Sequence, residues 1–149
     1  MKRVDIDRYR KQAHDILVQA NIQIPRYNNI EITDFGGKNF EKLGLALYIR
    51  INEEEYASKW LVTLPGQWCP NHYHKKIKET FICMAGDVRV WKNDAEVTLR
   101  PGEMITLLPL TWHKFTSEGG CIIEEITTKQ HPDDSYFEDT SIERYVKVE

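Results

Sequence analysis

The 149-residue sequence has few cysteines and no long apolar run, and each shortage excludes a class of protein. No C-x-x-C pair is present, and the cysteines lie in apolar or aromatic stretches typical of buried reduced thiols: Cys69, Cys83 and Cys121. No apolar run approaches the roughly 20 residues of a membrane helix, and no apolar secretory segment follows the charged N-terminus. We therefore expect a cytoplasmic protein with no membrane partner.

The sequence also lacks an excess of charge of one sign. Lys and Arg total 20 against 23 Asp and Glu, so the net charge is −3 and no strong basic field exists to bind a nucleic acid. No internal repeat is visible, and the hydrophobic content of 41% suits one core. We expect a single domain, residues 1–149, with a helical extension (1–25), a β-barrel (40–128) and a C-terminal tail packed on the barrel (129–149).

Apolar residues at three- and four-residue steps predict a helix near the N-terminus: Ile6, Tyr9, Ala13, Ile16, Leu17 and Ala20. Asp5 is placed to cap its first turn, and residues 21–25 end it. His14 lies within this helix with no other metal-type side chain one turn away. We therefore interpret His14 as an ordinary helix histidine.

From residue 43 the period changes to alternation, which predicts a strand with one apolar face made of Leu43, Leu45, Leu47, Ile49 and Ile51. Further strands, separated by glycine, proline and asparagine turns, are predicted at 56–64, 80–85, 87–91, 96–99, 104–108 and 121–128. Such short spacing leaves no room for crossover helices, so the strands must be largely antiparallel and closed into a barrel or jelly roll. The predicted fold is all-β with an N-terminal helix.

Two histidines two positions apart indicate a metal site. His72 and His74 share one side of a strand, and a turn can return Glu79 to the same place. His113, from a separate strand region, could complete the set across a closed barrel. Three nitrogens and one carboxylate leave coordination positions free for water or substrate, which is typical of a reactive metal site.

Two further groups near this motif could carry chemistry. Alternation sends either Glu124 or Glu125 inward without choosing between them, and a carboxylate inside a partly apolar barrel would have a raised pKa suited to a base. Beside the histidines lies a cluster of cations: Lys75, Lys76 and Lys78. Such a run is usually a solvated loop, although one ammonium could donate to a substrate oxygen or the cluster could attract a phosphate.

Three more side chains receive weaker interpretations. Trp68 and Trp112 adjoin the metal motifs, and their indole faces could stack on a ligand, but core packing is the more frequent role. His131 precedes a proline in an expected loop, and we interpret it as a surface residue.

These motifs resemble the cupin superfamily. The first cupin signature, G-x5-H-x-H-x4-E-x6-G, is matched with every spacing intact at Gly66, His72, His74, Glu79 and Gly86. The second, G-x5-P-x-G-x2-H-x3-N, is approximated, with altered gaps and without its last Gly and Asn, at Gly102, Pro109, Thr111 and His113. The resemblance implies a cupin barrel, a double-stranded β-helix or jelly roll, that holds a metal ion inside with the two histidines, the glutamate and His113.

Within the cupins, residues 40–145 are most similar to the D-lyxose isomerases. The stretches that carry the similarity are Ser58-Lys59, Leu64 to Gln67, Cys69-Pro70, Lys78 to Phe81, Pro109 to His113, Glu125, Thr127-Thr128, Asp134, Phe137, Asp139, Ile142 and Arg144. The similarity implies an isomerase that interconverts an aldose and a ketose, D-lyxose and D-xylulose, on a divalent ion. The ion is usually Mn, with Zn, Fe, Ni and Co also open.

In that family a Glu after the last metal His and a nearby Lys take part in the reaction. The resemblance therefore favours Glu125 as the base. We choose Lys78 as the catalytic lysine, although Lys75 and Lys76 are not separated from it. We also expect a homodimer, formed through sheet edges.

Two other functions stay open at this point. Three His and one Glu around iron also serve cupin dioxygenases, which bind substrate and oxygen together. A metal-containing cupin could also bind sugars without turnover, because fold alone does not establish catalysis.

Overall fold

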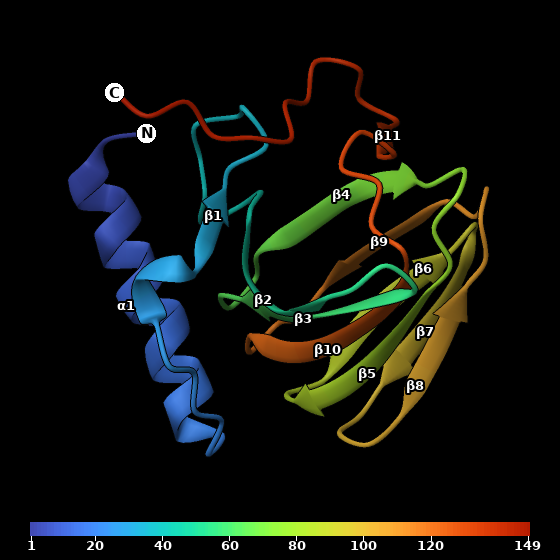
Figure 1. Ribbon diagram of the computed structural model, residues 1–149, viewed down its shortest axis with the longest axis horizontal. Coiled ribbons are helices and arrows are strands. Elements are labelled where there is room, and N and C mark those ends of the chain that lie inside the picture. The colour runs from blue at the N-terminus through green and yellow to red at the C-terminus, as the bar shows by residue number, and fades with distance from the viewer.

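The computed structural model describes residues 1–149 and consists of two facing antiparallel sheets with one α-helix beside them (Figure 1). The helix α1 (Arg3–Gln19) and the short 3-10 helix η1 (Tyr27–Asn29) come first. The strands then follow as β1 (Glu31–Thr33), β2 (Leu45–Asn52), β3 (Tyr56–Thr63), β4 (Trp68–Tyr73), β5 (Glu79–Ala85), β6 (Val88–Lys92), β7 (Ala95–Leu99), β8 (Met104–Leu107), β9 (His113–Thr116), β10 (Cys121–Thr128) and β11 (Tyr136–Phe137).

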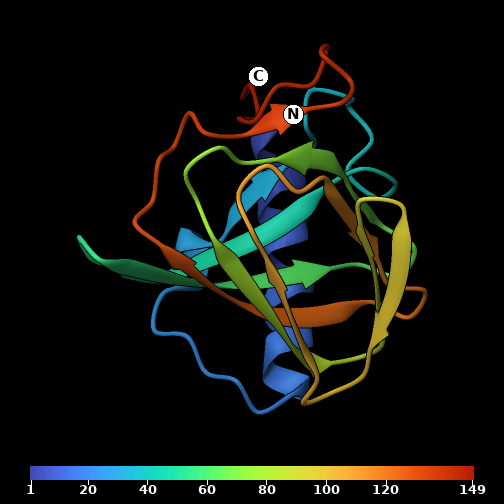
Figure 2. The same ribbon diagram turned by 90° about the vertical axis from the view of Figure 1, so that its right-hand side faces the viewer.

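The six-stranded sheet has the order β1-β2-β3-β10-β5-β8, and the five-stranded sheet has the order β11-β4-β9-β6-β7. Strands distant in sequence become neighbours: β10 lies between β3 and β5, and β9 lies between β4 and β6. Each sheet thus draws strands from both halves of the chain, as in a jelly roll. Figure 2 shows the sheets curving around a shared interior. The predicted all-β fold with an N-terminal helix is confirmed.

Helix α1 covers the outer face of the six-stranded sheet (Figure 1). Its apolar stripe recurs at three- and four-residue steps and is buried, as the sequence predicts. The stripe joins side chains of β3 and β10 in an apolar cluster that includes Tyr9, Leu17, Trp60, Val62 and Ile122. No helix of the structure has the length and apolar character needed to cross a membrane.

The helix begins before the predicted cap. Lys2 is the N-cap residue, in extended conformation and with no side-chain cap, so Asp5 lies inside the first turn. There its carboxylate is favoured by the unpaired N–H groups of the helix start, and it pairs with Arg8 at 3.2 Å. The prediction of Asp5 as the cap is wrong because the backbone enters the helix three residues earlier.

All seven predicted strands are present, with bounds within two residues. The apolar face predicted for β2 does not extend to its end. Leu45 and Leu47 are buried, but Ile49 is 41% exposed and the pairing with β3 shifts register between Ile49 and Ile51. Strands β4 and β9 are those expected around the histidines, for which no bounds were predicted. The structure also adds β1 and β11, which were not predicted because they are only three and two residues long.

A second apolar cluster fills the interior between the sheets and includes Phe81, Cys83, Val90, Phe115 and Ile123. All three cysteines are buried and unpaired, as expected of reduced thiols.

The C-terminal tail, residues 129–149, returns across one end of the sheets (Figures 1 and 2). Its strand β11 pairs with β4, where Tyr136 is opposite Tyr73 and Phe137 is opposite His72. Ile142 also packs against the interior cluster. The tail therefore lies directly beside the histidine motif.

Candidate metal centre

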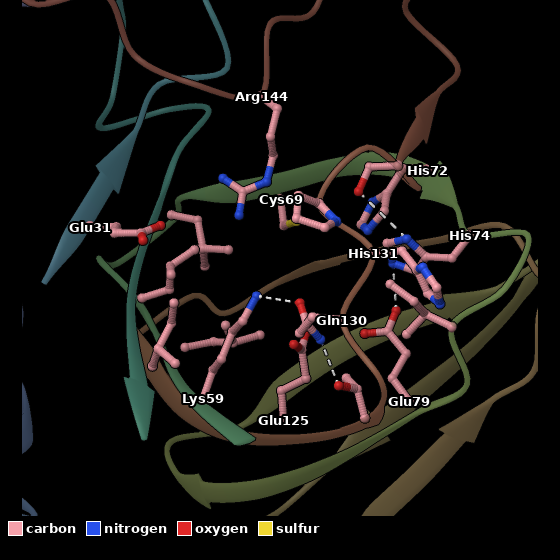
Figure 3. A pocket seen from close by; sticks show the side chains of 18 of the residues that line it. Glu31, Lys59, Cys69, His72, His74, Glu79, Glu125, Gln130, His131 and Arg144 are labelled. Carbon is pink, nitrogen blue, oxygen red and sulfur yellow. Dashed lines mark hydrogen bonds and ion pairs between the residues drawn. The ribbon is translucent and has the colours of Figure 1, made fainter. Parts of the chain in front are cut away.

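Four side chains from three strand regions converge inside the barrel, and Figure 3 shows three of them: His72, His74 and Glu79. His72 lies in β4 and His74 just after it, Glu79 is the first residue of β5, and His113 is the first residue of β9. One ligand atom from each lies within 4.8 Å of those from the other three. His72 and His113 are paired across β4 and β9, which places their rings 4.1 Å apart. The structure thus brings together the four ligands predicted from the sequence.

Each of the three imidazoles is held by a backbone carbonyl. The Nδ1 atoms of His72, His74 and His113 lie 2.7, 2.7 and 2.9 Å from the carbonyl oxygens of Pro70, Asp134 and Thr111. A carbonyl only accepts hydrogen bonds, so each Nδ1 carries the proton and donates. This leaves Nε2 as the ring atom that faces the centre, which is the arrangement that a metal ligand requires.

The centre has polar atoms without a suitable partner. Glu79 Oε1 lies 2.7 Å from His74 Nε2 and 3.0 Å from His113 Nε2. Both Glu79 Oε1 and His113 Nε2 are buried without a hydrogen-bond partner. Acceptor atoms this close repel one another unless a proton or a metal ion lies among them, so the donor set fits a divalent cation.

The protonation states also suit a cation. Burial, together with the neighbouring His113 and His74, holds the pKa of His72 well below its ordinary value, so His72 is neutral. Burial acts to raise the pKa of Glu79, but His113 and His74 outweigh it, and the pKa lies well below its ordinary value. Burial acts to lower the pKa of His74, but its contact with Glu79 outweighs this and raises that pKa. The centre therefore presents a carboxylate between the neutral imidazole of His72 and a second imidazole, that of His74, that favours a positive charge.

A cavity of about 190 Å³ opens beside the metal centre. His72, His74 and Glu79 line one part of it, whereas His113 is only 1% exposed and lies behind them. Figure 3 shows Lys59 and Glu125 on the neighbouring wall. The cavity can hold only a small ligand, which would meet the candidate metal centre at one end.

Two family models match the chain: that of the cupin domain over residues 60–124 and that of D-lyxose isomerase over residues 29–90. A D-lyxose/D-mannose isomerase of Thermosediminibacter oceani is 30% identical, in an alignment that covers 100% of this chain and 99% of that protein. The chain belongs to the D-lyxose isomerase family. A D-lyxose ketol-isomerase of a Thermofilum species is also 30% identical, over 93% of this chain and 94% of the relative.

Solved structures share the fold of this D-lyxose isomerase family member at lower identity. The L-ribose isomerase of Cellulomonas parahominis has a TM-score of 0.86 at 12% identity, and the alignment covers 100% of this chain and 98% of that one. The L-ribose isomerase of Geodermatophilus obscurus gives 0.85 at 14%, with the same coverage. The predicted cupin barrel is confirmed, and as a member of its family the protein is an aldose–ketose isomerase.

In this D-lyxose isomerase family chain, the two glutamates of β10 point to opposite sides. Glu124 lies on the outer face, where Arg50 donates to its carboxylate at 2.8 Å. Glu125 lines the cavity. Burial and the nearby Glu79 raise the pKa of Glu125 to about 8, against the opposing effect of the Lys59 charge.

The lysine beside this carboxylate is Lys59, which sequence reasoning did not choose. Lys59 of β3 is directly opposite Glu125 of β10, and its ammonium donates to Gln130 Oε1 at 3.0 Å inside the cavity. The structure does not bring Lys78 to the cavity: it is exposed and its backbone N–H donates to Thr128. The sequence did contain a signal for this lysine. Lys59 alternates with the outward-facing Trp60, so strand alternation would have placed Lys59 on the inward face of β3.

The remaining sequence candidates divide between the cavity and the surface. Lys75 is exposed, with its ammonium 4.3 Å from the Tyr136 ring centre. Trp68 packs against Trp91, with ring centres 5.3 Å apart and the rings tilted by 32°, and does not line the cavity.

The structure places His131 differently from our interpretation. It is half-buried and lines the cavity, because the loop that carries it folds over the opening. His14, by contrast, remains on the helix beside Tyr27, as interpreted.

Proposed function

We propose that this protein interconverts the aldose and ketose forms of a small free sugar, with D-lyxose and D-xylulose as the first pair to test. Its metal ligands would be His72, His74, Glu79 and His113, and manganese is the first ion to test. The observation that carries the proposal is one cavity in which three of these four residues, all but His113, face a carboxylate and an ammonium. A free sugar offers adjacent carbonyl and hydroxyl oxygens to such a set.

The reaction moves one hydrogen between adjacent carbons whose acidity in water is far too low at neutral pH. When bound, a divalent ion would act as a Lewis acid toward the two neighbouring substrate oxygens and lower the energy of the enediolate. The remaining requirement is a group that carries the proton from one carbon to the other.

Glu125 is the proposed proton carrier. Its carboxylate takes the proton from C2 of the aldose and returns it to C1, and a pKa raised to about 8 gives it a suitable basicity near neutral pH. Lys59, directly opposite on β3, would lend a proton to the C1 oxygen and recover one from the C2 hydroxyl. The two transfers together convert aldose to ketose with no net change in protons.

The proposal also covers the compartment, the oligomeric state and the domain organisation of the protein. Buried, unpaired cysteines are consistent with a reducing cytoplasm. The edge strands β8 and β7 could pair with a second copy, so we propose a homodimer, which sedimentation would test. We also propose that residues 1–149 fold as one domain, since helix, barrel and tail all contribute to the two apolar clusters.

The decisive experiment is metal reconstitution followed by isotope exchange. The protein is stripped with a chelator, reloaded separately with Mn, Co, Zn, Ni or Fe, and supplied with D-lyxose, D-mannose or L-ribose in D₂O. We expect ketose formation, with solvent deuterium entering the sugar, only after metal is restored. Oxygen consumption would instead indicate an oxygenase. Tight sugar binding with neither exchange nor product would indicate a binding protein, and either result would contradict the proposal.

A further inference from the structure

The rim of the cavity opposite the metal centre is built by the C-terminal tail. Two contacts fix the backbone there: Thr33, which is only 3% exposed, donates its hydroxyl to the carbonyl of Arg144 at 2.8 Å, and the N–H of Glu143 donates to the carbonyl of Phe35 at 3.1 Å. Because both contacts join the tail to β1 and its following loop, Arg144 leaves a fixed backbone at the cavity rim.

The side chain of Arg144 then enters the cavity (Figure 3). Its guanidinium lies 5.3 Å from the centre of the Tyr145 ring and makes no hydrogen bond or ion pair with the protein, although it carries five N–H donors. Its positive charge affects the pKa of a residue in the cavity wall. Burial, Glu79 and Glu125 raise the pKa of the Cys69 thiol, and Arg144 acts in the opposite direction. An unpaired cation held over a cavity is a ready donor for a ligand.

Glu31 complements this guanidinium. It comes from β1, lines the same cavity, and lies with Arg144 at the end away from His74 and Glu79 (Figure 3). A sugar hydroxyl both donates and accepts, so an arginine and a glutamate together satisfy it. A phosphate dianion would instead be repelled by Glu31. The charges at this end therefore favour an uncharged polyol over a sugar phosphate.

We propose that Arg144 binds the hydroxyl groups of the sugar farthest from its reacting carbons and so determines which sugars are accepted. The inference rests on the proposed isomerase function. It makes Arg144 a specificity-determining residue, supplied by the tail, whereas the reacting end of the sugar is held by residues of the barrel strands.

The test compares Arg144→Ala and Arg144→Lys with Lys147→Ala, a control on the same tail whose ammonium is exposed and pairs only with Glu143. The readouts are KM and kcat for the preferred aldose and the inhibition constant of the matching pentitol. We expect Arg144→Ala to raise both KM and the inhibition constant by roughly 30- to 100-fold, from the loss of two charge-assisted hydrogen bonds, with kcat within about threefold. Arg144→Lys recovers part of the loss, and Lys147→Ala changes neither constant.

Three outcomes would overturn the inference while leaving the isomerase function intact. The first is an unchanged KM and inhibition constant in Arg144→Ala. The second is a fall in kcat alone. The third is a wild-type preference for the 5-phosphorylated sugar that disappears in Arg144→Ala, which would make the ligand group a phosphate. A wild-type protein inactive on every aldose would instead contradict the proposed function itself.

A separate observation concerns Asp134, which is 4% exposed where the tail crosses the histidine motif. Its carboxylate accepts hydrogen bonds from the backbone N–H groups of Lys75, Lys76 and Ile77 at 3.0, 2.8 and 3.2 Å. Its own carbonyl accepts the Nδ1–H of His74 at 2.7 Å. One residue of the tail therefore holds both a candidate ligand and the loop that follows it.

That loop joins His74 to Glu79, so its position sets the separation between two members of the metal centre. We infer that Asp134 is a positioning residue for metal binding, acting through these two. Groups that orient a metal ligand in this way commonly contribute 10- to 100-fold to metal affinity. Asp134 itself would not touch the ion.

Asp134→Asn tests this role, because it keeps the carbonyl bond to His74 while replacing one acceptor oxygen of the side chain with a donor. The matched control is Asp139→Asn, an exposed aspartate of the same tail that caps Ser141. We expect the dissociation constants for Mn and Co, measured against a competing chelator, to rise about 10-fold or more in Asp134→Asn alone. The visible spectrum of the Co-loaded protein should also change. Wild-type affinity and spectrum in Asp134→Asn, even with a lower melting temperature, would overturn the inference.

Discussion

The two faces of the six-stranded sheet differ sharply, although neighbouring residues of the same strands form them. On the outer face, Trp60 of β3 and Ile122 of β10 pack with helix α1 in an apolar cluster. On the inner face, Lys59 and Glu125 of the same two strands line the cavity. A single step along β3 therefore separates a residue that stabilises the fold from one placed for chemistry.

This difference between the two faces predicts that substitutions on each face should affect a different property of the protein. Inner-face changes should reduce metal binding or turnover with the fold retained, and outer-face changes should reduce stability with turnover retained. The four predictions below test that separation, from the largest expected free-energy effect to the smallest.

The largest effect is expected for His113→Ala. Loss of one of four ligands from a buried site should remove most bound metal and lower kcat/KM by at least about 10³-fold, measured with metal analysis on the purified protein. His14→Ala is the control, because that histidine lies on α1 and outside the cavity. Full metal content and activity in His113→Ala would show that the site lies elsewhere.

Glu125→Gln should come next. The amide keeps the shape of the side chain but takes no proton, so kcat should fall by about 10²- to 10⁴-fold while metal content stays at the wild-type level. Glu124→Gln, one residue away on the outer face, loses only a surface pair with Arg50 and should keep wild-type kcat. Equal losses in the two variants would contradict the separation of the two faces.

Leu17→Ala probes the outer side of the sheet. The side chain is fully buried between α1 and the sheet, so its truncation should lower the free energy of unfolding by about 2–5 kcal/mol, measured by urea denaturation. At a temperature where the variant remains folded, kcat and KM should match the wild type. A large change in KM would mean that the helix affects the cavity through the sheet.

The smallest effect is expected from a pair of lysine substitutions. Lys59→Met should lower kcat/KM by roughly 10- to 100-fold, since it removes one charged donor to the substrate oxygens. Lys78→Met should leave kcat/KM unchanged, because that side chain is exposed outside the cavity. The reverse order of losses would restore our first choice of Lys78.

Much of this arrangement could be predicted from the sequence because local spacing determines it. The two histidines at the end of β4 and the glutamate at the start of β5 belong to one short segment, and strand alternation predicted β2 and the opposite directions of the two glutamates of β10. His113 could be included because a closed barrel brings distant strands together. The resemblance to a known family, and not alternation, favoured Glu125 over Glu124.

The missed features depend on pairings between distant segments. Lys59 is beside Glu125 only because β3 and β10 pair in one register, and the sequence pattern of either strand does not contain that register. His131, Arg144 and Asp134 belong to a tail with almost no regular structure, whose course is set by a few hydrogen bonds to β1 and to the loop after β4. No periodicity predicts such contacts.

The bond from His74 to the carbonyl of Asp134 spans 60 residues of sequence and has a consequence for biosynthesis. A chain still emerging from the ribosome exposes all four candidate ligands before Asp134 and the rest of the tail have left the exit tunnel. If Asp134 positions the metal centre as proposed, the emerging protein would bind its ion more weakly until Asp134 is in place.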